Sequence, residues 1–189
     1  MTRIIGGVAG SLKLASPAKS TRPTSDRIRE SIFSRLESRD AIAEARALDL
    51  YAGTGALALE ALSRGAKSAI LVEKDGKAAA VCTQNAQLIQ KNLEKQDIEV
   101  HTRVIVKAVA SFLSNDLGEY DLVFMDPPYE VENQQVEVEL AALLPRLSKG
   151  SVVIVERSSR TEDLVIPAGL EFEEKKNYGD TDVIWLNKN

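Results

Sequence analysis

The fold class is decided by one stretch of the chain, Ala47-Leu48-Asp49-Leu50-Tyr51-Ala52-Gly53-Thr54-Gly55. An apolar run leads into two glycines, and an Ala- and Leu-rich helical pattern follows over residues 56–62. The glycines let the backbone approach a ligand closely, and the first turn of the next helix has free N–H groups. The stretch therefore predicts a buried strand, a tight ligand-binding turn and a helix.

The same alternation of strand and helix continues along the chain. Further strand patterns cover residues 68–72, 100–106, 120–125 and 151–156, and helical patterns cover residues 77–92, 108–113 and 136–147. Two more strand candidates, residues 171–176 and 182–186, flank the turn signal Asn177-Tyr178-Gly179-Asp180. The pattern predicts an α/β fold with a Rossmann-like, mainly parallel seven-stranded sheet and an antiparallel C-terminal hairpin.

The N-terminal residues 1–40 differ from the rest in charge. They hold eight cations and four anions, a net charge of +4, whereas the whole chain is −4. The spacing of Ile28, Ile32, Phe33 and Leu36 predicts a helix capped by Thr24 or Ser25, with Arg27, Arg29 and Arg35 on its polar face. We expect a basic extension over residues 1–40 and an α/β domain over residues 41–189. A polyanion partner and a solvated arm explain this charge equally well.

Composition excludes several classes of protein. A chain of 189 residues buries one sizeable core. Without a run of about 18 apolar residues we expect no transmembrane helix, and the first residues lack the apolar region of a secretory signal. The single Cys82 excludes internal disulfides and a cysteine zinc cluster, and no other spacing suggests a metal. A cytoplasmic, metal-free protein without membrane contact is the expectation.

Candidate cofactor residues follow the first two predicted strands, since ligands in such sheets lie at the carboxyl ends of strands. Gly53, Gly55 and Ala58 match the dinucleotide-binding fingerprint in part. Glu73 ends the second strand, 18 residues after Gly55, where a carboxylate accepts both hydroxyls of a ribose. This logic serves any cofactor that contains adenosine.

The fourth predicted strand ends in Asp126-Pro127-Pro128-Tyr129. The prolines restrict the backbone and remove N–H donors, so the turn offers a carboxylate, carbonyl acceptors and an aromatic ring in a rigid arrangement. A nucleobase amine needs acceptors for its hydrogens and a ring to stack on. Asp126, Pro127 and Tyr129 are therefore the predicted catalytic residues.

Taken together, these motifs resemble those of class I S-adenosylmethionine-dependent amino-methyltransferases. Four further stretches restrict the resemblance to one family within this class. They are residues 3–7, 22–30 and 60–66 and Tyr178-Gly179-Asp180-Thr181. Over nearly its whole length the chain resembles the bacterial 16S ribosomal RNA guanine-N2 methyltransferase family, which acts during small-subunit assembly. The chain departs from the family pattern at two places. The N-terminal stretch Gly10-Ser11-Leu12-Lys13-Leu14 lacks an arginine that is common in the family, and residues 107–110 lack the acid that many members place near the adenine.

The resemblance implies S-adenosylmethionine as cofactor and 16S ribosomal RNA, in the small subunit or its assembly intermediate, as partner of a monomeric enzyme. It implies that Asp126 and the Pro127 carbonyl hold the guanine amine and that Tyr129 stacks on the base. The implied cofactor-binding residues are Asp49, Tyr51, Gly53, Thr54, Gly55, Glu73, Lys74, Ala108 and Val109. The implied RNA-binding residues are Arg3, Lys13, Arg22, Arg27 and Arg29.

Three alternatives stay open at this stage. A DNA adenine-N6 methyltransferase would share the cofactor motifs and the Asp-Pro-Pro-Tyr turn, although this chain has little length for further recognition segments. A nicotinamide-dependent oxidoreductase would explain the glycines but not Asp126–Tyr129. A non-catalytic RNA-binding assembly factor would explain the basic extension alone.

Overall fold

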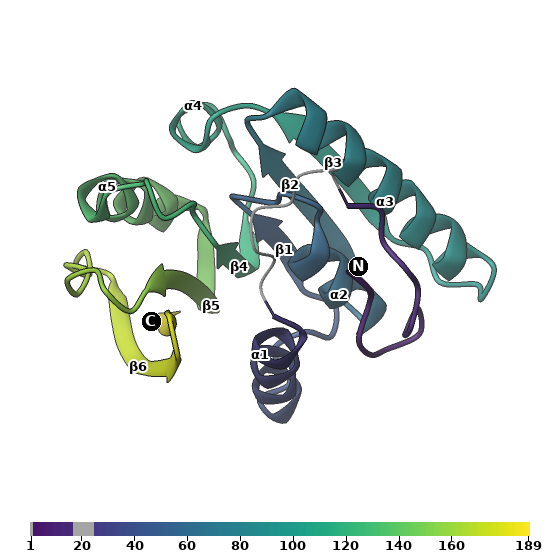
Figure 1. Ribbon diagram of the computed structural model, residues 1–189, viewed down its shortest axis with the longest axis horizontal. Coiled ribbons are helices and arrows are strands. Elements are labelled where there is room, and N and C mark those ends of the chain that lie inside the picture. The colour runs from purple at the N-terminus through teal and green to yellow at the C-terminus, as the bar shows by residue number, and fades with distance from the viewer. Residues whose placement is uncertain (1, 17–24) are drawn as a thin grey trace.

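The computed structural model describes residues 2–16 and 25–189, which form one seven-stranded sheet flanked by helices (Figure 1). The strand order is β3-β2-β1-β4-β5-β7-β6; the first five strands are parallel and β7 runs antiparallel to both neighbours. The sheet confirms the predicted fold class. The strands are β1 (Arg46–Asp49), β2 (Ser68–Glu73), β3 (His101–Val106), β4 (Tyr120–Met125), β5 (Leu147–Ser158), β6 (Leu170–Tyr178) and β7 (Thr181–Lys188).

Helices cover both faces of the sheet because side chains alternate along each strand. On β4, Leu122 and Phe124 join the core under the first three helices, whereas Val123 and Met125 join the core under the last two. Within the described ranges, no helix combines the length and apolarity needed to cross a bilayer. The helices are α1 (Asp26–Ser38), α2 (Ala56–Ser63), α3 (Gly76–Glu94), α4 (Val109–Leu113) and α5 (Asn133–Leu143), followed by the 3₁₀ turn η1 (Leu144–Arg146).

The N-terminal extension packs on the same core as the rest of the chain. Ile4 and Phe33 are fully buried in the cluster that also contains Phe124 of β4. The buried carboxylate of Glu60 in α2 accepts hydrogen bonds from the backbone N–H groups of Ile5 at 2.7 Å and Gly6 at 2.8 Å. Residues on both sides of position 40 therefore contribute to one core, and the division of the chain there stays a prediction.

One predicted element differs clearly from the structure. The helix expected over residues 136–147 ends as α5 at Leu143, and β5 already begins at Leu147. Pro145 lies in the intervening 3₁₀ turn, where its ring and missing N–H prevent further helical hydrogen bonds. The strand then starts early because Leu147 pairs with Tyr120 of β4. The helix predicted after Ser25 is confirmed as α1, with the Ser25 hydroxyl accepting from the N–H of Ile28 at 3.2 Å.

Candidate active site

The predicted site residues come together at one edge of the sheet. Asp49 ends β1, Glu73 ends β2 and Asp126 directly follows β4. The parallel pairing places Asp49 level with Leu71 of β2 and Phe124 of β4. The carboxyl ends of these strands are therefore adjacent, as expected for ligand binding in such a sheet.

The glycine turn after β1 has a conformation that side chains disfavour. Gly53 has a φ of +53° and Gly55 a φ of +84°, both in the left-handed region. A Cβ atom at Gly55 would lie 3.0 Å from the Leu71 side chain and 3.1 Å from the sulfur of Cys82, so this glycine packs against the core. A Cβ atom at Gly53 would meet nothing within 4 Å, so Gly53 borders open space.

Glu73 is held in place by backbone donors on both sides. Its Oε2 accepts from the Gly53 N–H at 2.9 Å, and its Oε1 accepts from the Asp75 N–H at 2.8 Å, just before α3. The next residue, Lys74, is exposed. Ala108, exposed, and Val109, buried, lie at the start of α4 after β3, the neighbour of β2. These four residues, all predicted to bind the cofactor, thus lie at the carboxyl ends of the neighbouring strands β2 and β3.

Asp49 is the most unusual acid of the site. Its side chain is 1% exposed, and its Oδ1 has no hydrogen-bond partner among the described residues. Burial, followed by the nearby charge of Asp126, raises the pKa of Asp49 to about 7. A buried carboxylate with a vacant acceptor position is suited to a cationic donor such as an ammonium group.

Tyr51 is connected to the opposite side of the site, at α5. Its hydroxyl donates to Oε2 of the buried Glu139 at 2.6 Å, and Gln135 donates to the other carboxylate oxygen at 3.0 Å. Burial and the charge of Glu139 raise the pKa of Tyr51 above its ordinary value. The phenol therefore stays protonated and links the residues after β1 to α5.

Asp126, Pro127 and Tyr129 line a cleft of about 620 Å³, which we call the central cleft. The start of α1, the end of β5 and the turn between β6 and β7 complete its walls. Pro127 is buried, whereas the Tyr129 side chain is 55% exposed and available for stacking. The lining residues are Ser25, Arg27, Ile28, Asp126, Pro127, Pro128, Tyr129, Glu130, Glu156, Arg157, Asn177, Tyr178, Gly179 and Thr181.

Two buried charged residues of this cleft were missed from the sequence. Glu156 and Arg157 lie near the end of β5, and each is only 4% exposed. The Arg157 guanidinium donates to the Val131 carbonyl at 2.7 Å and to Oδ1 of Asn133 at 2.8 Å, which fixes the loop that follows Tyr129. The rule that identified Glu73 and Asp126, a polar residue after an apolar strand, also applies to Glu156.

The residues predicted to bind RNA are found in different environments. Arg27 is exposed and lines the central cleft. Arg3 and Lys13, both exposed, pair across the N-terminal β-bridge, and the Arg3 guanidinium lies 3.8 Å from the Asp26 carboxylate. Arg22 lies outside the described residues.

For Arg29, the expected position on the exposed face of α1 is wrong. The side chain is 1% exposed, donates to Asp26 at 2.7 Å and lies 3.9 Å from the carboxylate of Glu60. The reason is helical periodicity, because Arg29 precedes the buried Ile32 and Phe33 by three and four positions and shares their face. It cannot reach RNA from this position.

Comparison with known proteins agrees with this architecture. The family described as conserved hypothetical protein 95 matches residues 2–187. Ribosomal RNA small subunit methyltransferase D of Escherichia coli is 32% identical over 178 residues, covering 94% of this chain and 85% of the relative. YlbH of Bacillus subtilis, named as a candidate rRNA methyltransferase, is 30% identical over 192 residues, covering 100% of this chain and 99% of the relative.

A solved structure shows the same fold. It is yhhF of Escherichia coli, a candidate methyltransferase, with a TM-score of 0.80, 31% identity, and coverage of 98% of this chain and 97% of that chain. The likeness confirms the class I methyltransferase fold predicted from the strand order and hairpin. The chain therefore belongs to the conserved hypothetical protein 95 family, together with the ribosomal RNA small subunit methyltransferase D proteins that its motifs resemble.

Proposed function

We propose that this protein transfers the methyl group of S-adenosylmethionine to the exocyclic N2 amine of a guanine in 16S ribosomal RNA. The observation that carries the proposal is the central cleft, where Asp126, Pro127 and Tyr129 lie together next to the strand ends with Asp49 and Glu73. The cleft offers acceptors for an amine. The glycine turn does not line the cleft itself but follows β1, the strand paired with β4, which leads into Asp126. The names of the relatives support ribosomal RNA as the substrate.

The residues at the strand ends fit the cofactor. S-adenosylmethionine supplies a methyl group on a positively charged sulfur. Asp49, with its vacant Oδ1, suits the ammonium group of the methionine part, and the open side of Gly53 allows its close approach. Tyr51, Thr54 and Gly55 complete that half of the site, and Glu73 and Lys74 serve the ribose, with Ala108 and Val109 at the adenine.

The chemistry needs positioning more than a strong base. The lone pair of a guanine amine is delocalised into the ring, so it must be aimed at the methyl group. The Asp126 carboxylate and the Pro127 carbonyl accept the two amine hydrogens, while the Tyr129 ring stacks on the base. Asp126 then receives the proton that the methylated amine releases. Preorganised acceptors in a partly buried cleft supply the electrostatic part of the rate enhancement.

The RNA-binding surface is proposed to include Arg3, Lys13, Arg22 and Arg27. The basic extension attracts the RNA phosphates, whereas the acidic remainder of the chain repels them. This charge distribution orients RNA toward the cleft. The proposed substrate is 16S RNA in the small subunit or its assembly intermediate. The protein acts there as a monomer in the cytoplasm.

The test uses small ribosomal subunits from cells that lack this protein. The purified protein is incubated with these subunits and isotopically labelled S-adenosylmethionine, and the modified nucleotide is mapped by mass spectrometry. We expect one labelled N2-methylguanine in 16S RNA. Label in DNA adenine would instead show a DNA methyltransferase. Binding to subunits without label would show an assembly factor, and thermal stabilisation by NAD but not S-adenosylmethionine would show an oxidoreductase.

A further inference from the structure

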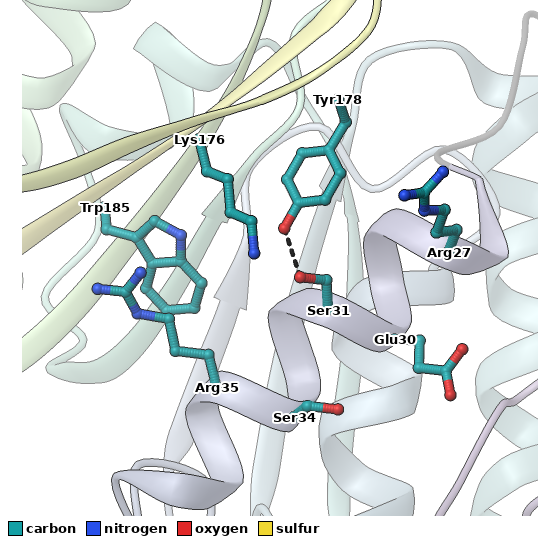
Figure 2. A pocket seen from close by; sticks show the side chains of 8 residues that line it. All are labelled: Arg27, Glu30, Ser31, Ser34, Arg35, Lys176, Tyr178 and Trp185. Atoms are coloured by element: carbon teal, nitrogen blue, oxygen red, sulfur yellow. Dashed lines mark hydrogen bonds between the residues drawn. The ribbon is translucent and has the colours of Figure 1, made fainter.

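A second cleft of about 560 Å³ adjoins the central cleft between α1 and the β6–β7 hairpin (Figure 2). We call it the side cleft. It shares Arg27 and Tyr178 with the central cleft, so the two clefts are adjacent. A substrate longer than one nucleotide that enters the central cleft therefore has a neighbouring space beside α1.

The middle of the side cleft is polar. The hydroxyls of Ser31 in α1 and Tyr178 in β6 are hydrogen-bonded across it. The Lys176 ammonium lies 5.4 Å from the centre of the Tyr178 ring, and Figure 2 shows it directed from the hairpin into the space above α1. Within residues 2–16 and 25–189, neither Lys176 nor Arg27 has an ion-pair partner. Two cations thus lie in the same cleft as two hydroxyls, and neither cation is paired with an acid among the described residues.

The other charged residues of the side cleft have different roles. Arg35 is paired with Glu173 at 2.6 Å and with Glu174, and its guanidinium lies 4.5 Å from the centre of the Trp185 ring. These contacts join α1 to the β6–β7 hairpin and form the wall of the side cleft that lies away from the central cleft. Glu30 is the one acid among the described lining residues, and Figure 2 shows its carboxylate directed away from Lys176.

We propose that the side cleft binds the nucleotide next to the methylated guanine, with its phosphate at Lys176 and Arg27 and its ribose at the Ser31 and Tyr178 hydroxyls. The inference rests on the proposed function, because it needs a polynucleotide whose target base occupies the central cleft. The backbone of such a strand joins the target covalently to its neighbour, which must lie in an adjoining space. Hydroxyls that donate and accept hydrogen bonds suit the 2′-hydroxyl of RNA, and unpaired cations suit its phosphate.

The first experiment compares Lys176→Ala with Lys175→Ala. The two lysines are neighbours on β6, but Lys175 projects from the other face of the strand and is paired with Asp163 at 2.5 Å. With small subunits as substrate, Lys176→Ala should raise KM by about 3–10-fold with kcat unchanged, and should reduce the salt slope of binding by about 0.7. Lys175→Ala removes the same charge and should leave both within twofold. Equal behaviour of the two variants would overturn the proposal.

The second experiment locates the bound strand directly. Ser34 lines the side cleft and is exposed, whereas the native Cys82 is fully buried, so Ser34→Cys accepts a single thiol-reactive photo-crosslinker. On small subunits we expect a crosslink to 16S RNA next to the methylated nucleotide, and none there from a crosslinker on Ser114→Cys, at the end of α4. A crosslink to a ribosomal protein, or to a remote part of the RNA, would overturn the inference. Failure of the proposed function would be recognised by a different result, namely that the wild-type protein adds no methyl group to these subunits.

Discussion

The proposed cofactor side and the proposed RNA side of the site are built in different ways. Asp49, Gly53, Gly55 and Glu73 all lie within residues 49–73 and follow two adjacent parallel strands. The RNA side instead combines the start of α1 with the turn at residues 177–181, from opposite ends of the chain. The cofactor side is thus a product of local sequence, whereas the RNA side exists only because the antiparallel hairpin returns to α1.

Asp126 joins the two sides, so its loss should have the largest effect. We expect Asp126→Ala to lower kcat by about 10²–10³-fold, because one acceptor for the amine and for its proton disappears. S-adenosylmethionine affinity should change only a few-fold. Single-turnover methylation and calorimetric cofactor binding measure the two effects. Asp126→Asn keeps one acceptor oxygen, so its kcat should lie between those of the wild type and Asp126→Ala. Turnover near the wild-type value in Asp126→Ala would refute the role of Asp126.

The buried Glu60 carboxylate holds the N-terminal extension through Ile5 and Gly6. Its loss should lower the stability of the fold and leave the chemistry unchanged. Glu60→Gln leaves Arg29 and Arg64 without their buried counter-charge. We expect a loss of about 3 kcal/mol in the free energy of unfolding, or roughly 6–12 °C in Tm. Calorimetry or urea titration measures it.

The matched control is Glu37→Gln, since Glu37 pairs with the same Arg64 at 2.8 Å but is 51% exposed. That variant should lose less than about 1 kcal/mol, because an exposed ion pair is screened by solvent. Equal losses in the two variants would contradict the view that Glu60 anchors the extension.

The cofactor side can be tested separately at Asp49. Asp49→Asn should weaken S-adenosylmethionine binding by about 10–100-fold at pH 7.5, since a charge-assisted hydrogen bond is lost. Because the folded pKa of Asp49 is about 7, wild-type affinity should rise between pH 6 and pH 7.5 as the carboxylate forms. Titration calorimetry across this range should show the rise in the wild type and a flat profile in the variant.

The same raised pKa has the opposite consequence for the unliganded protein. A carboxyl that ionises less readily when folded contributes stability at low pH, which is lost as pH rises from about 4 to about 7. Asp49→Asn should not show this loss. A variant whose unfolding free energy follows the wild-type pH profile would assign the titration to another group.

The smallest effect should come from the exposed cation of the RNA side. Arg27→Ala should raise KM for small subunits by about 3–5-fold and leave Tm unchanged, because the side chain is exposed. Arg29→Ala, two positions along α1, should instead lower Tm, since it removes the buried partner of Asp26 and Glu60. Steady-state kinetics and thermal unfolding separate the two; a Tm loss in Arg27→Ala would contradict its assignment to binding.

The sequence by itself was sufficient for the elements that depend on local pattern. Apolar runs predicted the strands, the glycines at 53 and 55 predicted the turn, and a polar residue after a strand identified Glu73 and Asp126. The strand and turn predictions hold because these conformations are set by neighbouring residues, and parallel strands end at one edge. Glu73 and Asp126 lie at strand ends as expected, and their roles stay predictions. The limit of α5 was set more locally still, by Pro145.

Tertiary structure alone decided which charges are buried and which line the cleft. Arg27 and Arg29 look alike in the sequence. Packing of α1 on α2 nevertheless places Arg29 beside Glu60 and leaves Arg27 at the central cleft. The side cleft depends in the same way on the pairing of β7 with β5 and β6, which brings Lys176 and Tyr178 next to Ser31. Contacts between residues so far apart depend on the register and packing of the whole sheet, which no short stretch of sequence encodes.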